Sequence, residues 1–368
     1  MNQKVKKIIL STAITIMMGY ILVQGGGQIL KRYAEKTFYP VMVYAMEGDE
    51  KSNFSELLLK GLSPFYSYMN DNKTVSVAVE DDLTYEMILA KQENDEDTEN
   101  ENIEVNTQEE AITTSKISMD KLRDFNYLLS KFYTVDSTTT IDSKQLNVDQ
   151  LLSKEMQIDT TKKGPKVLIF HTHSQEAFTN SVENDKSTTI VGMGEYLAKL
   201  LNEKGIETIH HEGVYDLING KLDRSNAYQM AEIGVKEILN QYPSIEVVID
   251  LHRDGVPETT HLVTEINGKQ TAKIMFFNGL SRTRTNGEIA YLPNPYIQDN
   301  LSFSLQMQLA CEEQYPGFAR RIYLKAYRYS LHMMPKSLLI EAGAQTNSVE
   351  EVKNAMEILA NILVEVLL

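Results

Sequence analysis

The carboxyl-terminal half of the chain alternates between short apolar runs and longer amphipathic segments. Short apolar runs are typical of strands that are buried on both faces of a sheet. They predict strands at residues 167–170, 206–210, 246–251, 273–278 and 337–341. Apolar residues at helical spacing predict helices at residues 194–204, 226–240, 300–314 and 349–366. Strands that alternate with helices indicate an α/β domain over residues 161–368, with a mostly parallel sheet flanked by helices.

A long apolar run near the amino terminus has a different pattern. It extends from Ile8 to about Gln24, follows three lysines, and meets no charge before Lys31. Its length is at the lower end of the roughly 17–25 residues that cross a membrane, and it is longer than the apolar part of a cleaved signal peptide. Lysines before such a run place the amino terminus in the cytoplasm. We expect residues 1–29 to be a retained single-pass anchor and the rest of the protein to lie outside the cell membrane.

Two regions separate the anchor from the α/β domain. Residues 30–90 mix apolar and polar positions, and we expect them to form an extracytoplasmic amino-terminal region. Residues 91–110 carry many acids, one lysine and almost no large apolar side chains. Such a composition cannot bury enough surface to offset the entropy lost on ordering. We expect residues 91–160 to be an acidic, largely disordered linker, with short helices at residues 120–135 and 149–158.

Composition narrows the classes of function. The net charge of −15 argues against a nucleic-acid partner, because phosphates favour a basic surface. The single cysteine, Cys311, excludes an internal disulfide and a zinc site built from cysteines. The cysteine count does not by itself decide the compartment.

Side chains capable of chemistry follow three of the predicted strands. The carboxyl ends of parallel strands lie at one edge of a sheet, where open α/β sheets bind their ligands. These side chains are therefore expected to converge. After the strand at residues 167–170 the candidates are His171, His173 and Glu176. At the end of the strand at residues 246–251 they are Asp250, His252, Arg253 and Asp254, and at the end of the strand at residues 337–341 the candidate is Glu341.

These residue types suit a catalytic zinc site, which needs three protein ligands and one open position for water. His173, Glu176 and His252 can supply the ligands, with His171 as the alternative to His173. The spacing between His173 and Glu176 would place both side chains on one face of a helical turn. Amide hydrolysis also needs a carboxylate that takes and returns protons, and Glu341 can supply it.

The remaining candidates surround these ligands. Asp250 and Asp254 are candidates to fix the tautomer of a ligand histidine, since such histidines usually donate their other N–H to an acceptor. Arg253 has two interpretations: it pairs with one of these aspartates, or it binds substrate.

Four segments resemble the stage II sporulation protein P family of endospore-forming bacteria, which is related to the zinc-dependent N-acetylmuramoyl-L-alanine amidases. The resemblance covers roughly residues 166–368, and the amino-terminal anchor agrees in layout. The segments are VLIFHTHSQEAF (167–178), GEYLAKLLNEKGI (194–206), YPSIEVVIDLHRD (242–254) and LLIEAGAQTN (338–347).

The resemblance implies a membrane-anchored peptidoglycan hydrolase that acts at the sporulation septum during engulfment. It would cleave the amide between N-acetylmuramic acid and L-alanine of the stem peptide, with an additional endopeptidase activity on cross-links. Its implied partners are the stage II sporulation proteins D, a lytic transglycosylase, and M, a membrane protein. Two alternatives remain: a metallocarboxypeptidase-like peptide hydrolase, and a catalytically inactive membrane-tethered scaffold of the wall.

The resemblance also assigns site residues. His173 or His171, together with His252, would bind Zn²⁺, and Glu341 would match the catalytic glutamate of the amidases. The amidases take their carboxylate ligand from the start of the first helix. Glu183 and Glu195 lie in that region without a clean match, so Glu176 stays the expected ligand.

Overall fold

The computed structural model describes residues 117–368 of the chain. The predicted anchor (1–29), the extracytoplasmic region (30–90) and the first part of the predicted linker lie outside the described residues. Within residues 117–368, no helix combines the length and apolar character that a membrane crossing requires.

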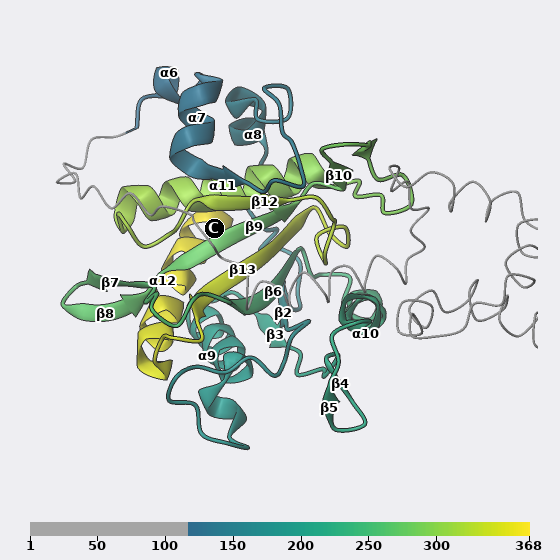
Figure 1. Ribbon diagram of the computed structural model, residues 1–368, viewed down its shortest axis with the longest axis vertical. Coiled ribbons are helices and arrows are strands. Elements are labelled where there is room, and N and C mark those ends of the chain that lie inside the picture. The colour runs from purple at the N-terminus through teal and green to yellow at the C-terminus, as the bar shows by residue number, and fades with distance from the viewer. Residues whose placement is uncertain (1–116) are drawn as a thin grey trace, which may run out of the picture. The chain divides into compact units, whose positions relative to one another are not determined.

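A seven-stranded sheet forms the centre of the described domain, in the order β1-β12-β9-β13-β6-β2-β3 (Figure 1). All neighbouring strands are parallel except β9 and β13, which are antiparallel, so the sheet consists of two parallel blocks that run in opposite directions. The carboxyl ends of β2, β6 and β13 therefore share one edge. The strands of the sheet are β1 (Tyr133–Val135), β2 (Val167–Phe170), β3 (Thr208–His210), β6 (Val247–Asp254), β9 (Ile274–Gly279), β12 (Ile322–Lys325) and β13 (Lys336–Ala344).

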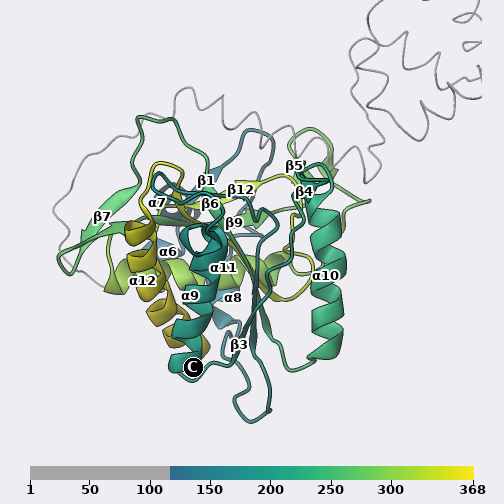
Figure 2. The same cartoon turned by 90° about the horizontal axis from the view of Figure 1, so that it is seen from below.

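Helices cover both faces of this sheet, as Figure 2 shows, with α10 on one side and α9, α11 and α12 on the other. The side chains of β2 alternate between these layers. Val167 and Ile169 pack in the core beneath α9, α11 and α12, whereas Leu168 and Phe170 pack with residues of α10. A strand covered on both faces reads as a continuous apolar run, which is why β2 was predicted with its observed bounds. The helices are α6 (Met119–Leu122), α7 (Phe125–Phe132), α8 (Val148–Ser153), α9 (Ile190–Glu203), α10 (Ala227–Gln241), α11 (Ile297–Gln314) and α12 (Val349–Leu367), with a 3₁₀ turn, η1 (Lys186–Thr188).

The folded domain begins earlier than the predicted boundary at residue 161. Leu128, Phe132 and Leu151 are almost fully buried in the main core, and β1 pairs in parallel with β12. The helix predicted at residues 120–135 ends at Phe132, where the chain enters β1. Residues from Met119 on therefore belong to the domain rather than to a disordered linker. A fragment that started at Lys166 would lose an edge strand and part of the core.

Three two-stranded hairpins project from the domain. Two of them turn at Asn-Gly pairs: Asn219–Gly220 and Asn267–Gly268 all have positive φ, as a type I′ turn requires. The sequence carries this hairpin signal, although the elements predicted above do not include it. The hairpin strands are β4 (Leu217–Ile218) with β5 (Lys221–Leu222), β7 (Val263–Ile266) with β8 (Lys269–Ala272), and β10 (Arg282–Thr283) with β11 (Gly287–Glu288).

Candidate metal centre

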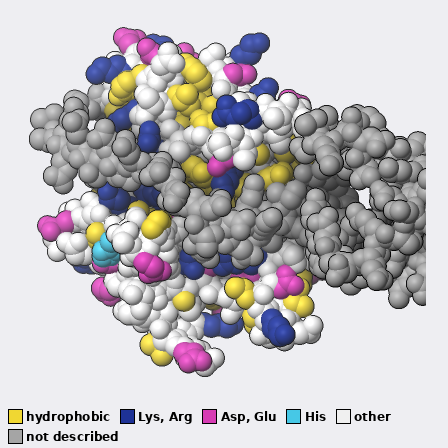
Figure 3. Space-filling model, viewed as in Figure 1, with side chains coloured by type: hydrophobic (Ala, Val, Ile, Leu, Met, Phe, Trp, Pro, Cys, Tyr) yellow, Lys and Arg dark blue, Asp and Glu magenta, His cyan; other side chains and the backbone are white. Residues whose placement is uncertain are grey.

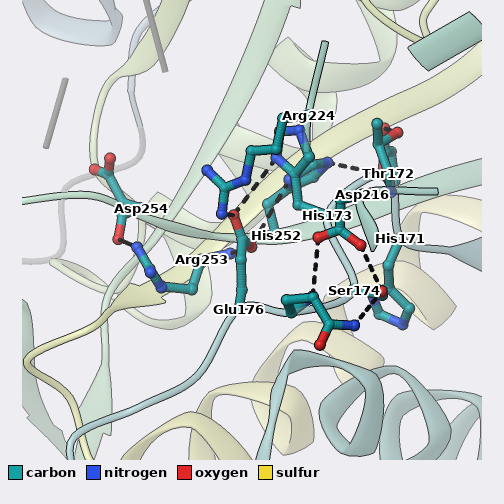
Figure 4. A network of polar contacts seen from close by, with 12 residues as sticks. His171, Thr172, His173, Ser174, Glu176, Asp216, Arg224, His252, Arg253 and Asp254 are labelled. Atoms are coloured by element: carbon teal, nitrogen blue, oxygen red, sulfur yellow. Dashed lines mark hydrogen bonds and ion pairs between the residues drawn. The ribbon is translucent and has the colours of Figure 1, made fainter. Parts of the chain in front are cut away.

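Two histidines and a glutamate converge at the shared edge of β2 and β6 (Figure 4). Each offers one ligand atom, and the three atoms lie within 4.8 Å of one another. His173 Nδ1 is 3.6 Å from Glu176 Oε1, and His252 Nδ1 is 3.8 Å from Glu176 Oε2. All three side chains are buried. This group consists of the three residues that the sequence proposes as metal ligands, and it could hold a metal ion.

Asp250 orients His252. The two residues are two apart on β6, so their side chains share the face of the sheet that α10 covers. His252 Nε2 donates to Asp250 Oδ1 at 2.7 Å, which leaves Nδ1 directed toward Glu176. Asp250 is held in turn by Thr172, whose backbone N–H and hydroxyl both donate to its carboxylate. Asp250 therefore has the position expected of a residue that fixes the tautomer of a ligand.

The electrostatics of the group favour a cation. Burial opposes a charge on His252, but the carboxylates of Asp250 and Glu176 outweigh burial and raise the pKa of His252 well above its usual value. Burial likewise acts to raise the pKa of Glu176, but hydrogen bonds from His173 and His252 outweigh it and hold that pKa well below its usual range. Two ionised carboxylates beside His252 stabilise a positive charge there, whether it comes from a proton or from a metal ion.

The main chain and one arginine also hold Glu176. The backbone N–H of Arg253 donates to Glu176 Oε2 at 2.8 Å, and Arg224 Nη2 lies 3.7 Å from Glu176 Oε1. The backbone carbonyl of Glu176 accepts from the N–H of Ile190, at the start of α9. Glu176 is thus fixed at both its backbone and its carboxylate. The two other glutamates considered, Glu183 and Glu195, are exposed.

His171 lies outside the group, on the opposite face of the sheet. Its Nδ1 donates to the carbonyl of Leu251 at 2.7 Å, and its Nε2 lies 2.9 Å from His210 Nε2. Gly194 of α9 packs against both rings, since a Cβ there would clash with His171 Nε2 and His210 Nε2. His171 and His173 would share a face only if the strand stayed extended, but β2 ends at Phe170. The geometry therefore favours His173 as the ligand.

The His171–His210 contact predicts a pH dependence of folding. Burial lowers the pKa of His210 to about 4 and that of His171 to about 3, whereas both are near 6.5 in an unfolded chain. The fold therefore prefers the neutral rings. Their contribution is fully present above about pH 6.5 and is lost as the pH falls toward 4.

For His210 alone we expect a loss of about 2 kcal/mol of unfolding free energy between pH 7 and pH 5, measured by urea titration at each pH. His210→Gln keeps a side-chain donor for His171 but does not titrate, so it should reduce the measured loss by about that amount, while the contribution of His171 remains. An unchanged slope in that variant would contradict the assignment.

Glu341 lies beside His252. The two residues are register partners on the parallel strands β13 and β6, so their side chains lie on the same face of the sheet. The pairing of β13 becomes irregular directly after Glu341, and Gly343 adopts a φ of +66°. Bulges of this kind often redirect side chains next to active sites. Glu341 is only partly buried, unlike the three clustered residues.

The two remaining candidates, Asp254 and Arg253, do not make the contacts that the sequence suggested. Asp254 pairs with Arg320, so it does not orient either ligand histidine. The side chain of Arg253 donates to the carbonyl of Asp254, and only its backbone N–H reaches Glu176. The sequence-based interpretation of Arg253 as an ion-pair partner of Asp250 or Asp254 is not what the structure shows.

Several residues around the centre were missed by sequence reasoning. Thr172 holds Asp250, and the buried carboxylate of Asp216 accepts from Ser174 Oγ and from the N–H of Gln175. The ring of Tyr228 packs edge-on against His173, with centroids 5.6 Å apart. The only local signal near them is the Asn219–Gly220 hairpin. Arg224 and Asp216 lie close to its two ends, but nothing local shows that they reach Glu176 and the loop of His173.

Comparisons with known proteins place the chain in a family. The family model for stage II sporulation protein P matches residues 52–364. The stage II sporulation protein P of Bacillus subtilis (strain 168) is 21% identical over 248 residues, which cover 61% of this chain and 59% of that protein. The match thus spans less than two thirds of the curated relative.

Solved structures resemble this chain more distantly than the family relative does. The CwlD amidase from Clostridioides difficile, solved in complex with the GerS lipoprotein, is 16% identical, with a TM-score of 0.34 over 55% of this chain and 99% of that one. The catalytic domain of the CD27L endolysin, which targets Clostridia difficile, is 14% identical. Its TM-score is 0.35, and the match covers 55% of this chain and 96% of that one. At these values the likenesses carry no argument about function. The family match covers most of the chain and confirms the resemblance seen in its motifs: this chain belongs to the stage II sporulation protein P family.

Proposed function

We propose that this chain is a zinc-dependent peptidoglycan hydrolase of sporulation, which cleaves the amide between N-acetylmuramic acid and L-alanine of the stem peptide. The observation that carries the proposal is the buried group of His173, Glu176 and His252 beside Glu341, in a chain of this family.

The residues present fit a zinc ion. Two imidazoles and one carboxylate are a donor set of catalytic zinc sites, which keep a further position open for water or substrate. His252 presents Nδ1 because Asp250 holds Nε2, and such a second acceptor is typical of metal-binding histidines. A zinc ion bound there would polarise the amide carbonyl and lower the pKa of a bound water to about 7.

The chain's own residues would supply the remaining functions. The backbone N–H of Arg253 and the side chain of Arg224 hold the carboxylate of Glu176 in place. Against the effect of burial, hydrogen bonds from His173 and His252 keep that carboxylate ionised. Asp250 keeps the proton of His252 on Nε2. A carboxylate oxygen of Glu341 would accept a proton from the attacking water and return it to the leaving nitrogen, because an amine leaves only when protonated.

The biological setting is proposed from family membership. We place the protein in the cell membrane at the sporulation septum, with a single amino-terminal span, a cytoplasmic amino terminus and an extracytoplasmic catalytic domain. It would remodel septal peptidoglycan during engulfment, together with the stage II sporulation proteins D and M. A second activity, hydrolysis of peptide cross-links, would use the same centre.

Product analysis tests the proposed reaction. The purified full-length chain is incubated with sacculi, and the newly formed ends are identified by mass spectrometry. An amidase exposes the lactyl carboxyl of muramic acid together with the amino group of L-alanine, and an endopeptidase exposes ends within the cross-links. A metallocarboxypeptidase would release single amino acids, and an inactive scaffold would release nothing. Either of the last two results would overturn the proposal, and so would full activity after removal of zinc by a chelator.

A further inference from the structure

One buried carboxylate near the centre has no part in the proposed reaction. Acidic and basic side chains are interspersed over the described surface seen in Figure 3, where water solvates them. Asp216, directly before β4, is instead fully buried, with 0% of its surface exposed. A buried carboxylate is costly unless hydrogen bonds replace the water that it loses. The partners of Asp216 therefore indicate its role.

The loop that carries His173 and Glu176 supplies partners for both oxygens of this carboxylate. Ser174 Oγ donates to Asp216 Oδ1 at 2.7 Å, and the backbone N–H of Gln175 donates to Asp216 Oδ2 at 3.0 Å. Figure 4 shows the carboxylate facing these donors. Ser174 is itself buried. Each oxygen of Asp216 thus holds one residue of the loop.

The two residues held by Asp216 are those that separate the candidate ligands. Ser174 and Gln175 lie between His173 and Glu176 and form an isolated turn outside any helix. The conformation of this turn sets how the two ligand side chains meet, with His173 Nδ1 3.6 Å from Glu176 Oε1. A turn outside any helix or strand has no regular hydrogen-bond pattern to fix it, so it depends on partners elsewhere.

Other contacts fix the two ends of the loop. Thr172 donates to Asp250 at one end, and the carbonyl of Glu176 accepts from the first residue of α9 at the other. Asp216 acts between these ends. Its own position is set by the β4–β5 hairpin, which the N–H of Asp223 closes by donating to the carbonyl of Asp216 at 2.9 Å. The acceptor is thus in place before any metal ion binds.

We propose that Asp216 is a positioning residue, which holds the turn between His173 and Glu176 so that both side chains reach the same metal ion. This inference rests on the proposed function. Asp216 is not one of the three clustered residues that could hold the ion. A loop that is already fixed loses less conformational entropy when the ion binds, so the affinity is higher. Without Asp216, metal binding would have to order the turn, and the affinity would fall.

The zinc affinity of the full-length protein, measured against a competing chelator, tests this inference. Asp216→Ala removes both acceptors, and we expect zinc to bind about 10- to 100-fold more weakly, as is typical when a group that orients metal ligands is lost. Asp216→Asn should stay within about threefold of the parent, because its amide can accept from the Gln175 N–H and donate to Ser174 Oγ. In both variants one ion should still bind per chain at saturating zinc.

Ser174→Ala gives a second test, which decides the question if Asp216→Ala does not fold. It removes one of the two donors, so we expect a smaller loss of zinc affinity, about 3- to 10-fold. Added to Asp216→Ala, it should cause no further loss, because the two variants remove the same contact. Losses that add in full would contradict a shared contact.

Asp142→Ala is the matched control. The carboxylate of Asp142 also accepts from backbone N–H groups of a loop, those of Lys144 and Gln145. This loop follows β1, whose carboxyl end lies at the opposite edge of the sheet from those of β2 and β6. Its zinc affinity should equal that of the parent.

Hydrogen exchange of the metal-free protein separates this inference from the proposed function. The N–H of Gln175 donates to Asp216, so its exchange should be faster by about 10-fold or more in Asp216→Ala and close to that of the parent in Asp216→Asn. Mass spectrometry of a peptide that contains Gln175 measures this exchange. If the parent binds no zinc, the proposed function is rejected, and the exchange still decides whether Asp216 holds the turn.

Three further results would overturn the inference. The first is parental zinc affinity in Asp216→Ala or in Ser174→Ala. The second is an equal loss in Asp216→Asn and Asp216→Ala, which would mean that the negative charge, rather than the hydrogen bonds, supports the metal. The third is a loss of binding that saturating zinc does not restore, which would make Asp216 a ligand.

Discussion

His252→Ala is expected to abolish peptidoglycan hydrolysis, with a loss on the order of 10³-fold or more, and to release the bound zinc. The variant removes one of three ligand atoms that lie within 4.8 Å of one another. It also leaves the buried carboxylates of Asp250 and Glu176 without the imidazole between them. Zinc content by mass spectrometry and the release of soluble fragments from sacculi measure the two effects.

Loss of the ring could also weaken the fold, because a buried charge that loses its partner costs roughly 3–5 kcal/mol. Asp250→Asn is the milder test. It keeps the shape of the side chain but weakens its hold on His252, and we expect zinc affinity to fall by about 10- to 100-fold. His261→Ala is the control, since His261 is an exposed histidine paired with Glu351. If His252→Ala digests sacculi at the parent rate, the metal mechanism is wrong.

Glu341→Gln is expected to reduce hydrolysis by roughly 10²- to 10⁴-fold while leaving zinc content unchanged. The amide has nearly the same size as the carboxylate but cannot take a proton from water. Glu341 neighbours His252 across the β13–β6 pairing and is not one of the three clustered residues that could hold the metal. Its replacement should therefore spare the metal. The measurement compares kcat on a muramoyl peptide with bound zinc in the same preparation.

Glu265→Gln provides the matched control, because Glu265 is exposed on the β7–β8 hairpin. Two outcomes would reject the assigned role. Unchanged turnover in Glu341→Gln would mean that another group carries the proton, and loss of zinc would mean that Glu341 is a ligand instead.

Much of the central fold could be predicted because its strands are buried on both faces. Val167–Phe170 appears in the sequence as four consecutive apolar residues and forms β2 with those bounds. The same reasoning found β6, β9 and β13, and it placed the reactive side chains at one edge, where parallel strands end together. These predictions depend only on local patterning and on a general property of parallel sheets.

Pairings between distant segments could not be predicted in this way. The short strands β1 and β12 pair although they are far apart in the chain, and neither carries a local signal strong enough to be recognised. The antiparallel pairing of β9 with β13 likewise depends on the path of the chain between the two strands, which local patterns do not encode. For the same reason, residues from Met119 on were assigned to a linker, since their apolar side chains find partners only in the folded domain.

The sequence by itself therefore determined the α/β class, the edge of the sheet that holds the chemistry, and the set of residues that can bind a metal there. The tertiary structure alone decided which of them meet. His171 and His173 are two apart, but the chain leaves the strand after Phe170 and Thr172 bonds to Asp250, so the two rings lie on opposite faces. Side-chain direction beyond a strand end depends on such contacts with other segments. That is why Glu176 and Arg224 meet only in the fold.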